Sequence, residues 1–321
     1  MDATPQTLQE AIQRFSNEQV CIDTVAAIRW PNGPECPACG HKEHYYLKTQ
    51  RRWKCKECYK QFTVKLGTIF EDSPLGLDKW LCGMWLIANA KNGISSWEVH
   101  RALGISQKAA WFMLHRLRYA LQSGSLKKMG GNGGEVEADE TYVGGSLRNM
   151  HKSKRLARFG YQRGSVGKAI VMGILDRSQK KVHAKVLRAA SIPLLQGEIR
   201  EKVETGTNLY TDEAQAYTGM DREYAHQVVR HIEQYVDGRV HTNGLENFWS
   251  LLKRGLNGTY VCVEPFHLFR YVDEQVFRFN NRATRDNPMT DADRFRLALS
   301  QIAGKRLTFA EVTGKTNEQS F

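Results

Sequence analysis

The sequence predicts a mixed α/β domain that is preceded by a small cysteine module and a helical region. Three observations support this order. Four cysteines form two C-x-x-C pairs within residues 36–58, and apolar residues recur at helical spacing over residues 80–121. Short β-rich segments then precede two strongly helical ones. With 321 residues, the chain is long enough for one large domain with a good core and small accessory modules.

The glycine-rich segment MGGNGG, at residues 129–134, marks the main predicted boundary. After it, VEADETYVGG, KAIVMGILD, KVHAKVL and TNLYTD are typical of strands, and residues 243–256 and 264–281 are typical of helices. We predict five parts: a helical lead-in (1–29), a cysteine module (30–65), a helical region (66–128), the α/β domain (129–285) and a C-terminal helix with a polar tail (286–321).

The charge of the chain favours a polyanionic partner. Lys and Arg number 46 and Asp and Glu 34, which gives a net charge of +12. Nucleic acid is the first candidate, and a merely soluble basic protein is the alternative. The N-terminus lacks the basic start and apolar core of a secretory signal, and the longest apolar run, residues 80–90, is well short of the ~20 residues that span a bilayer. We therefore expect a cytoplasmic protein without a membrane segment.

The cysteine module has the spacing of a zinc ribbon, C-x2-C-x15-C-x2-C. The four predicted ligands are Cys36, Cys39, Cys55 and Cys58. A module this small needs the metal in order to fold, so we predict a structural zinc ion. The remaining cysteines have no partner at ligand spacing and are interpreted as ordinary thiols: Cys21, Cys82 and Cys262.

The surface of the predicted ribbon is basic. Its Lys and Arg residues cluster around the two cysteine turns: Lys48, Arg51, Arg52, Lys54, Lys56 and Lys60. This clustering favours contact with nucleic acid over a solvated face or a protein contact, and Arg51, Arg52 and Lys54 are the candidates.

The helical region fits a helix-turn-helix. Gly104 provides a turn and Ser106 a cap for a helix that carries basic residues and would enter a major groove. The predicted DNA contacts are Ser106, Gln107, Lys108 and Arg116. The alternative is a plain three-helix bundle, because the apolar residues of the same helix are typical of a core.

Three acidic residues on distant predicted elements are candidate metal ligands. Asp139 lies inside one strand-like segment, Asp212 ends another, and Glu246 lies in a helix-like segment. Two metal ions about 4 Å apart can activate a water or a 3′-hydroxyl and stabilise the leaving oxygen of a phosphodiester, and Mg²⁺ prefers oxygen ligands. Lys253 follows Glu246 by two helical turns, so a carboxylate and a phosphate-binding cation can share one face. The alternatives are helix caps, salt bridges and a solvated helix face.

A resemblance selects among these acids. The segments VEADETYVGG, YTDEAQAY and HTNGLENFWSLLKRG, behind a CPACG…CKEC ribbon, resemble the bacterial insertion-sequence transposases that have a zinc ribbon and an ISXO-type DDE domain; the likeness covers about residues 15–285. It implies a ribonuclease H-like catalytic domain. In that domain Asp139, Asp212 and Glu246 would hold two Mg²⁺ or Mn²⁺ ions, with Lys253 as the basic residue that follows the third acid.

Neighbouring residues compete with this set on chemistry alone. Glu137, Glu140 and Glu213 lie beside the predicted acids, although Glu140 should point to the opposite strand face from Asp139. The resemblance, and not the spacing, therefore selects Asp139. Asn243 and Asn247 are alternatives that could assist or replace Glu246.

Residues 148–168 form a second basic segment, which contains no acidic residue. We expect it either to hold phosphates near the cut or to be a solvated loop. The candidate DNA contacts of this segment and of the helix after Glu246 are Lys152, Lys154, Arg155, Arg158, Lys253 and Arg254.

The main hypothesis is a DNA transposase that binds the terminal inverted repeats of an element, cuts them and joins them to target DNA. We expect it to act on double-stranded DNA as a homodimer or higher oligomer, in the bacterial cytoplasm and at the nucleoid when bound to DNA. The alternatives are a zinc-ribbon DNA-binding regulator and a metal-dependent nuclease that cuts without joining.

Overall fold

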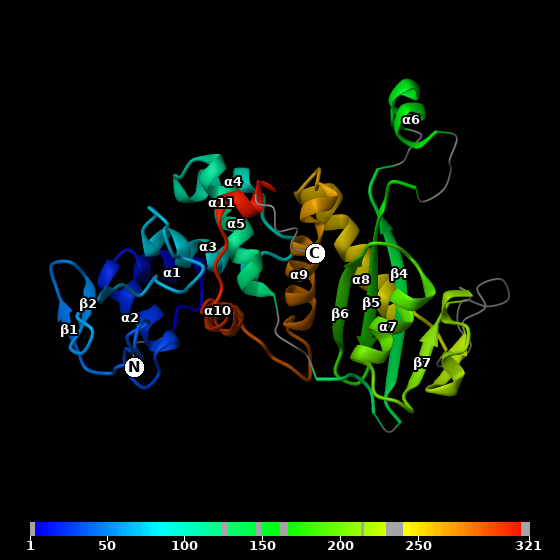
Figure 1. Cartoon of the computed structure of the whole chain (residues 1–321), viewed down its shortest axis with the longest axis horizontal. Coiled ribbons are helices and arrows are strands. Elements are labelled where there is room, and N and C mark those ends of the chain that lie inside the picture. Colours follow the sequence, from blue (N-terminus) through cyan, green and yellow to red (C-terminus); the bar gives the residue numbers. More distant parts are fainter. Residues whose placement is uncertain are drawn as a thin grey trace. The chain divides into compact units, whose positions relative to one another are not determined.

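The computed structural model describes residues 4–122, 127–131, 133–145, 149–160, 166–212, 215–228 and 240–315 (Figure 1). The chain divides into two compact units. The first unit combines Met1–Ser123 with Asn281–Phe321, and the second is the continuous segment Gly124–Asn280. The second unit is thus inserted into the sequence of the first.

The first unit contains a zinc ribbon and a group of helices. The helices are α1 (Leu8–Phe15), α2 (Glu18–Arg29), α3 (Leu77–Asn89), α4 (Ser96–Leu103), α5 (Gln107–Leu121), α10 (Asp291–Ser300) and α11 (Phe309–Val312). Most begin at a side chain that accepts a hydrogen bond from the first turn, as Ser95 does for α4 and Ser106 for α5. Helix α3 is apolar on nearly all sides because it packs against α1, α4, α5 and α10.

The C-terminal segment completes the core of the first unit. The ring of Phe295 in α10 lies between those of Phe15 and Trp85, with centroid distances of 5.6 and 5.3 Å. Lys305 donates hydrogen bonds to the carbonyl groups of Tyr119, Ala120 and Gln122 at the end of α5. These carbonyls have no partner within the helix, so Lys305 caps it from a distant part of the chain.

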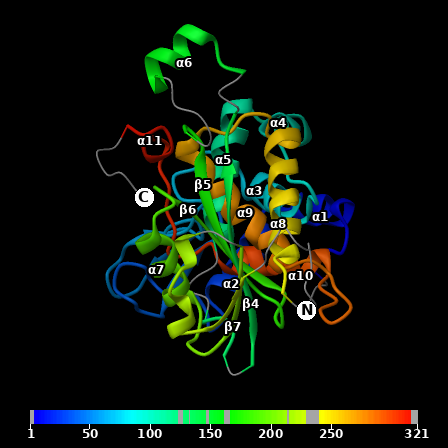
Figure 2. The ribbon, with the colours of Figure 1, turned by 90° about the vertical axis from the view of Figure 1, so that its right-hand side faces the viewer.

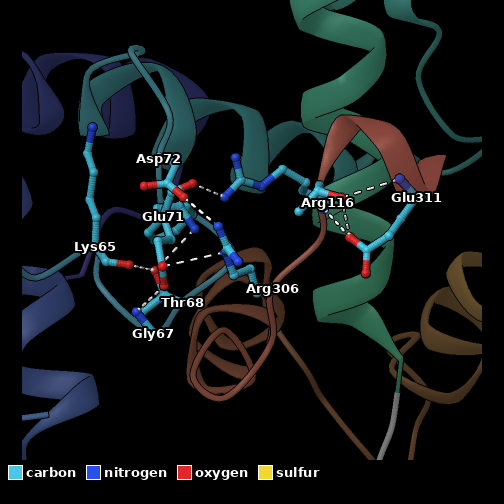
Figure 3. A network of polar contacts seen from close by, with 10 residues as sticks. Lys65, Gly67, Thr68, Glu71, Asp72, Arg116, Arg306 and Glu311 are labelled. Atoms are coloured by element: carbon cyan, nitrogen blue, oxygen red, sulfur yellow. Dashed lines mark hydrogen bonds and ion pairs between the residues drawn. The ribbon is translucent and has the colours of Figure 1, made fainter. Parts of the chain in front are cut away.

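A polar network ties the same segment to the turn that precedes α3 (Figure 3). Arg306 forms ion pairs with Glu71 and Asp72, and Arg116 of α5 donates to the carbonyl oxygen of Glu71. The turn and α5 are therefore held together by residues from three separate stretches of sequence.

The zinc ribbon is a small antiparallel sheet of β1 (His44–Leu47), β2 (Arg52–Cys55) and β3 (Gln61–Phe62). Its core is aromatic, because the rings of Trp53 and Phe62 stack with centroids 5.9 Å apart and Trp30 meets both edge-on. A core of this size buries little apolar surface, which agrees with the expectation that a structural metal ion supports the module.

The second unit is a five-stranded mixed sheet with helices on both faces (Figure 2). The strand order is β6-β5-β4-β7-β8, where β4 (Glu135–Val143), β7 (Asn208–Thr211) and β8 (Ala225–Val228) are parallel. Strand β5 (Ala169–Asp176) is antiparallel to both β4 and β6 (Lys181–Leu187). This architecture confirms the predicted α/β, ribonuclease H-like mixed sheet.

The two faces of the sheet have separate cores. Val136 and Ala138 of β4 face α7 (Ile192–Lys202), whereas α8 (Asn243–Arg254) and α9 (Leu268–Asn280) pack on the other face through residues such as Phe248 and Val272. The next residues of β4, Glu137 and Asp139, point toward the α8 face because side chains alternate along a strand. Short helices η2 (Gln215–Tyr217), η3 (Met220–Arg222), η4 (Gly255–Thr259) and η5 (Pro265–His267) lie in the connections.

Helix α6 (Lys152–Phe159) is inserted between β4 and β5. In both views it stands beyond the end of these strands at which Val143 pairs with Ala169 (Figures 1 and 2). None of the helices in the described part of the chain is long and apolar enough to cross a membrane.

Candidate functional site

Asp139, in the middle of β4, and Asp212, directly after the end of β7, lie on neighbouring parallel strands. Glu137 of β4 is the register partner of Tyr210 of β7, and each aspartate follows its partner residue by two positions. The charge of Asp212 contributes to the raised pKa of Asp139, which indicates that the two carboxyl groups are near enough to repel each other. The structure thus brings together two of the three acids predicted from the sequence.

The environment of Asp139 disfavours its negative charge. Burial raises the pKa of Asp139 to about 7. The hydrogen bond from Trp249 lowers this pKa, whereas the charges of Asp212 and Glu140 raise it further. Two neighbouring, partly buried carboxyl groups favour binding of a proton or a cation, because either relieves the repulsion.

Glu140 faces the opposite side of β4 from Asp139, as predicted. Its carboxylate accepts a hydrogen bond of 2.6 Å from the hydroxyl of Tyr217, which is buried in η2. Burial raises the pKa of Glu140, and the charge of Asp212 adds to this effect. Gln196 of α7 donates to the carbonyl groups on either side of Tyr217. Tyr217 is therefore held through its side chain by Glu140 and through the neighbouring backbone by Gln196.

Helix α8 is tied to β4 at two points. The backbone N–H of Leu245 donates to the carboxylate of Glu137 at 3.0 Å, and the indole N–H of Trp249 donates to Oδ2 of Asp139 at 2.8 Å. Glu137 is 1% exposed and also accepts a hydrogen bond from Arg177. Its role is therefore to anchor the start of α8.

A glycine in the neighbouring strand makes this approach possible. Gly173 of β5 is the register partner of Asp139, and a Cβ atom built there would lie 2.7 Å from two ring carbons of Trp249. Any side chain would therefore push α8 away from the sheet.

The third predicted acid, Glu246, is exposed on α8, three residues before Trp249. Lys253 is exposed four residues after Trp249, and Arg254, Asn243 and Asn247 are exposed as well. Residues three or four apart share one side of a helix, so Trp249 places this side of α8 next to Asp139. Among the described residues, the only group of three or more acidic, His or Cys side chains with ligand atoms within 4.8 Å of one another is the cysteine cluster of the ribbon.

The zinc site has the predicted four ligands. The sulfur atoms of Cys36, Cys39, Cys55 and Cys58 lie within 4.8 Å of one another. The pairs Cys36–Cys58 and Cys39–Cys55 are 3.6 Å apart. This is close to the edge of about 3.8 Å expected for a tetrahedron with Zn–S bonds of ~2.3 Å.

The backbone of the ribbon turns around the site and favours the thiolate form of Cys36. The residues after each pair, Gly40 and Tyr59, have φ angles of 74° and 59°, which turn the chain back around the site. Burial acts to raise the pKa of Cys36, but hydrogen bonds from the amides of Ala38 and Cys39 outweigh it and lower the pKa to about 7. The thiolate is the form that binds metal.

The predicted DNA contacts differ in their surroundings. Ser106 and Lys108 are exposed at the start of α5, and Gln107 donates to Ser96 of α4. Arg116 is only 3% exposed and stacks over Trp80 in addition to its bond to Glu71. The prediction that Arg116 contacts DNA is therefore wrong, since its guanidinium is used inside the first unit.

The basic residues of the ribbon and of α6 are more exposed to solvent than Arg116. Arg51 is exposed and pairs with Glu18, Arg52 donates to Gln61, and Lys54 lies over the ring of Tyr59. Lys152 and Lys154 are exposed on α6, and Arg155 is partly exposed. The side chains of Arg158, Arg148, Arg163 and Glu213 lie outside the described residues.

Comparisons with known proteins agree with this geometry. Residues 132–280 match the model of the ISXO2-like transposase domain, and residues 16–61 match that of the transposase zinc-ribbon domain. A transposase-like protein of Haemophilus influenzae is 31% identical over 102 residues, which cover 32% of this chain and 82% of that relative. The chain belongs to the ISXO2-like transposases.

Other relatives are more distant. A protein from the transposable element ISH50 of Halobacterium salinarum is 27% identical to the transposase over 257 residues, which cover 77% of this chain and 85% of the relative. A chain in a cryo-EM structure of the simian T-cell lymphotropic virus intasome matches 65% of the transposase and 70% of its own length, with 13% identity. Its TM-score of 0.29 is too low to carry an argument.

The sequence alone did not single out Trp249, Tyr217 or Gly173. The two aromatic residues lie at spacings typical of a core, so nothing in the pattern separated them from packing residues. Gly173 did leave a signal, because a glycine inside a strand often marks a close approach by another segment.

Proposed function

We propose that this transposase cuts and joins DNA with two divalent metal ions, Mg²⁺ or Mn²⁺, that are bound by Asp139, Asp212 and Glu246. The proximity of Asp139, in the middle of β4, to Asp212, directly after the parallel strand β7, supports this proposal most directly. The pKa of Asp139, raised to about 7 by burial and by its acidic neighbours, indicates a site that gains from a cation. The donor set consists of carboxylate oxygens, which suit Mg²⁺ and Mn²⁺.

The residues of the chain have separate roles in this proposal. Asp139 and Asp212 bind the metal ions from the sheet, and Glu246 completes the set from α8. When bound, two such ions activate a water or 3′-hydroxyl nucleophile and stabilise the leaving oxygen. Lys253 holds a DNA phosphate on the same side of α8 as Glu246.

DNA reaches this site through basic surfaces on both units. In the first unit we assign contacts to Arg51, Arg52 and Lys54 of the ribbon and to Ser106, Gln107 and Lys108 at the start of α5. In the second unit we assign them to Arg254 and to the basic residues of α6: Lys152, Lys154, Arg155 and Arg158. Helix α6 follows β4, whose last residue, Val143, is four residues after Asp139, and this supports a role near the cut (Figure 1).

We further infer that the protein works on the terminal inverted repeats of its element and on target DNA, as a homodimer or higher oligomer, in the bacterial cytoplasm and at the nucleoid. The functional parts correspond to a zinc ribbon, a helix-turn-helix-like region and a catalytic domain.

A cleavage and joining assay tests the proposal. Purified protein is incubated with labelled element ends and a target plasmid in Mg²⁺, and single variants Asp139→Ala, Asp212→Ala and Glu246→Ala are compared with wild type. Each variant should lose strand cleavage while it retains specific DNA binding, because the ribbon and α5 are untouched. A variant that cuts at a near wild-type rate would remove that residue from the site.

The same assay separates the alternatives. Cleavage that is followed by joining to the plasmid supports a transposase with the proposed chemistry. Cleavage without joined product would indicate a nuclease, and binding without cleavage would indicate a regulator.

A further inference from the structure

We infer that Trp249 is a positioning residue that orients the carboxylate of Asp139 for metal binding and sets the place of α8, with Glu246 and Lys253, beside it. This inference rests on the proposed metal site at Asp139. It goes beyond the three acids and the lysine, because Trp249 would act through Asp139 and not on DNA or metal directly.

The first argument concerns the oxygens of Asp139. Oδ2 accepts a hydrogen bond of 2.8 Å from the indole N–H of Trp249, and Oδ1 accepts one of 2.9 Å from the backbone N–H of Glu140. A carboxylate has about four lone-pair sites, two on each oxygen. One site on each oxygen is occupied by a protein donor, so the plane of the carboxylate is fixed and one site per oxygen is left for cations.

The second argument concerns the register between α8 and β4. The two donors, at Leu245 and Trp249, are four residues apart on the helix, and the two acceptors, Glu137 and Asp139, are two residues apart on one face of the strand. Four helical residues rise about 6 Å and two strand residues about 6.6 Å, so the spacings match. With both bonds formed, α8 can neither slide nor rotate freely along β4. Glu246 and Lys253 flank Trp249 on the helix, and their positions are fixed with it.

The third argument concerns the choice of a tryptophan. The indole N–H donates a hydrogen bond but carries no charge, so it orients Asp139 without a positive group that would compete with a metal ion. Trp249 is 5% exposed and packs against Gly173 and Phe248 in the core that also contains Leu245, so its N–H is held in place. The simpler interpretation is that a buried Trp needs any acceptor for its N–H. A metal titration separates the two interpretations.

The first experiment uses Trp249→Phe in the full-length, zinc-loaded protein, which keeps an aromatic ring but removes the donor. Binding of Mn²⁺ is measured by isothermal titration calorimetry, and thermal unfolding is measured without added Mn²⁺. We expect affinity for Mn²⁺ to fall tenfold or more, as is typical when a partner of a metal ligand is lost. The matched control is Phe248→Leu, which disturbs the same core but keeps the hydrogen bond. It should lower the unfolding temperature with less than a threefold change in affinity.

The second experiment observes Trp249 directly in the wild-type protein. The protein contains seven tryptophans, so 5-fluorotryptophan labelling gives seven ¹⁹F signals, and the signal that Trp249→Phe removes identifies Trp249. In wild type this signal should shift with Mg²⁺ and broaden with Mn²⁺. Asp139→Asn should abolish the response.

The outcomes are distinct for the two levels of inference. If Mn²⁺ binds to wild type and to Trp249→Phe equally well, and the ¹⁹F signal does not respond, the role of Trp249 is wrong and the metal site stands. If Phe248→Leu loses as much affinity as Trp249→Phe, the effect is general loosening and the role is also wrong. If wild type binds no Mn²⁺ outside the ribbon, both the proposed metal site and the role of Trp249 are wrong.

Discussion

The substitution Gly173→Ala should weaken catalysis although Gly173 has no functional group. The added Cβ would lie 2.7 Å from Cη2 and Cζ2 of Trp249 and 2.9 Å from Cδ2 of Leu245. Ordinary carbon contacts begin at about 3.5 Å, so α8 must move by roughly 0.8 Å. Such a shift would stretch the hydrogen bond of 2.8 Å between Trp249 and Asp139 to about 3.6 Å, which is beyond hydrogen-bond range.

The expected magnitudes follow from this displacement. Overpacking of a core by one methyl group costs about 1–3 kcal/mol of unfolding free energy, and a misplacement near 1 Å in an active site can lower a rate by on the order of 100-fold. We therefore expect the Gly173→Ala variant to unfold at a lower urea concentration than wild type. We also expect it to cleave labelled ends roughly 10- to 100-fold more slowly.

The control is Gly197→Ala in α7, where a Cβ meets nothing within 4 Å. Alanine favours a helix over glycine by roughly 0.5–1 kcal/mol, so this variant should be as stable as wild type or more so, and equally active. Wild-type stability and cleavage in Gly173→Ala would refute the argument that a close approach of α8 to β5 sets the site.

Three further predictions concern other parts of the chain. Cys55→Ser, or chelation of the full-length protein, should release one zinc ion and unfold the ribbon; ordered ribbon resonances after complete chelation would contradict the ligand assignment. Lys253→Arg should keep more cleavage activity than Lys253→Ala, and the Ala variant should bind pre-cut ends with a log–log salt slope lower by about one. Burial acts to raise the pKa of Glu198, but His183 and Lys185 lower it to about 2. The folded pKa lies below the unfolded value, so Glu198 should stabilise the protein above about pH 4.5. This stabilisation should be lost toward pH 2. Glu198→Gln should lower the free energy of unfolding by roughly 1–2 kcal/mol at pH 7, a modest value because Lys185 is half exposed. In acid denaturation curves, this difference from wild type should disappear as the pH falls toward 2. A cost that does not change with pH would show that the ion pairs are not its source.

Local patterns in the sequence were enough to predict several parts of the site. The cysteine spacing gave the four zinc ligands because two short turns can be recognised without any knowledge of the rest of the fold. The alternation along β4 predicted that Glu140 faces away from Asp139, and the end of the strand-like segment TNLYTD made Asp212 a candidate. These features depend on a few consecutive residues and on the geometry of a strand.

Features that depend on distant partners were not predictable. Arg116 has the pattern of a polar residue on an amphipathic helix, yet it is buried because the turn at residues 65–72 covers that side of α5. Its neighbours His115 and Arg118 are buried too. Periodicity shows that a helix has an apolar side, but it does not show what covers the rest. Trp249 is a similar case, since only the fold reveals that its N–H meets Asp139.

The first unit can be completed only late in synthesis, because its sequence is interrupted by the second unit. The second unit is continuous and can fold once it has left the ribosome, whereas α5 lacks its cap until Lys305, 183 residues beyond Gln122, has been made. At about 5–20 residues per second, this interval is roughly 10–35 seconds. Phe295, which fills the core between Phe15 and Trp85, also arrives late. Products of early termination would therefore lack a finished first unit even when the sheet of the second unit is intact. If the first unit binds DNA as proposed, these products would be poor competitors for the same DNA.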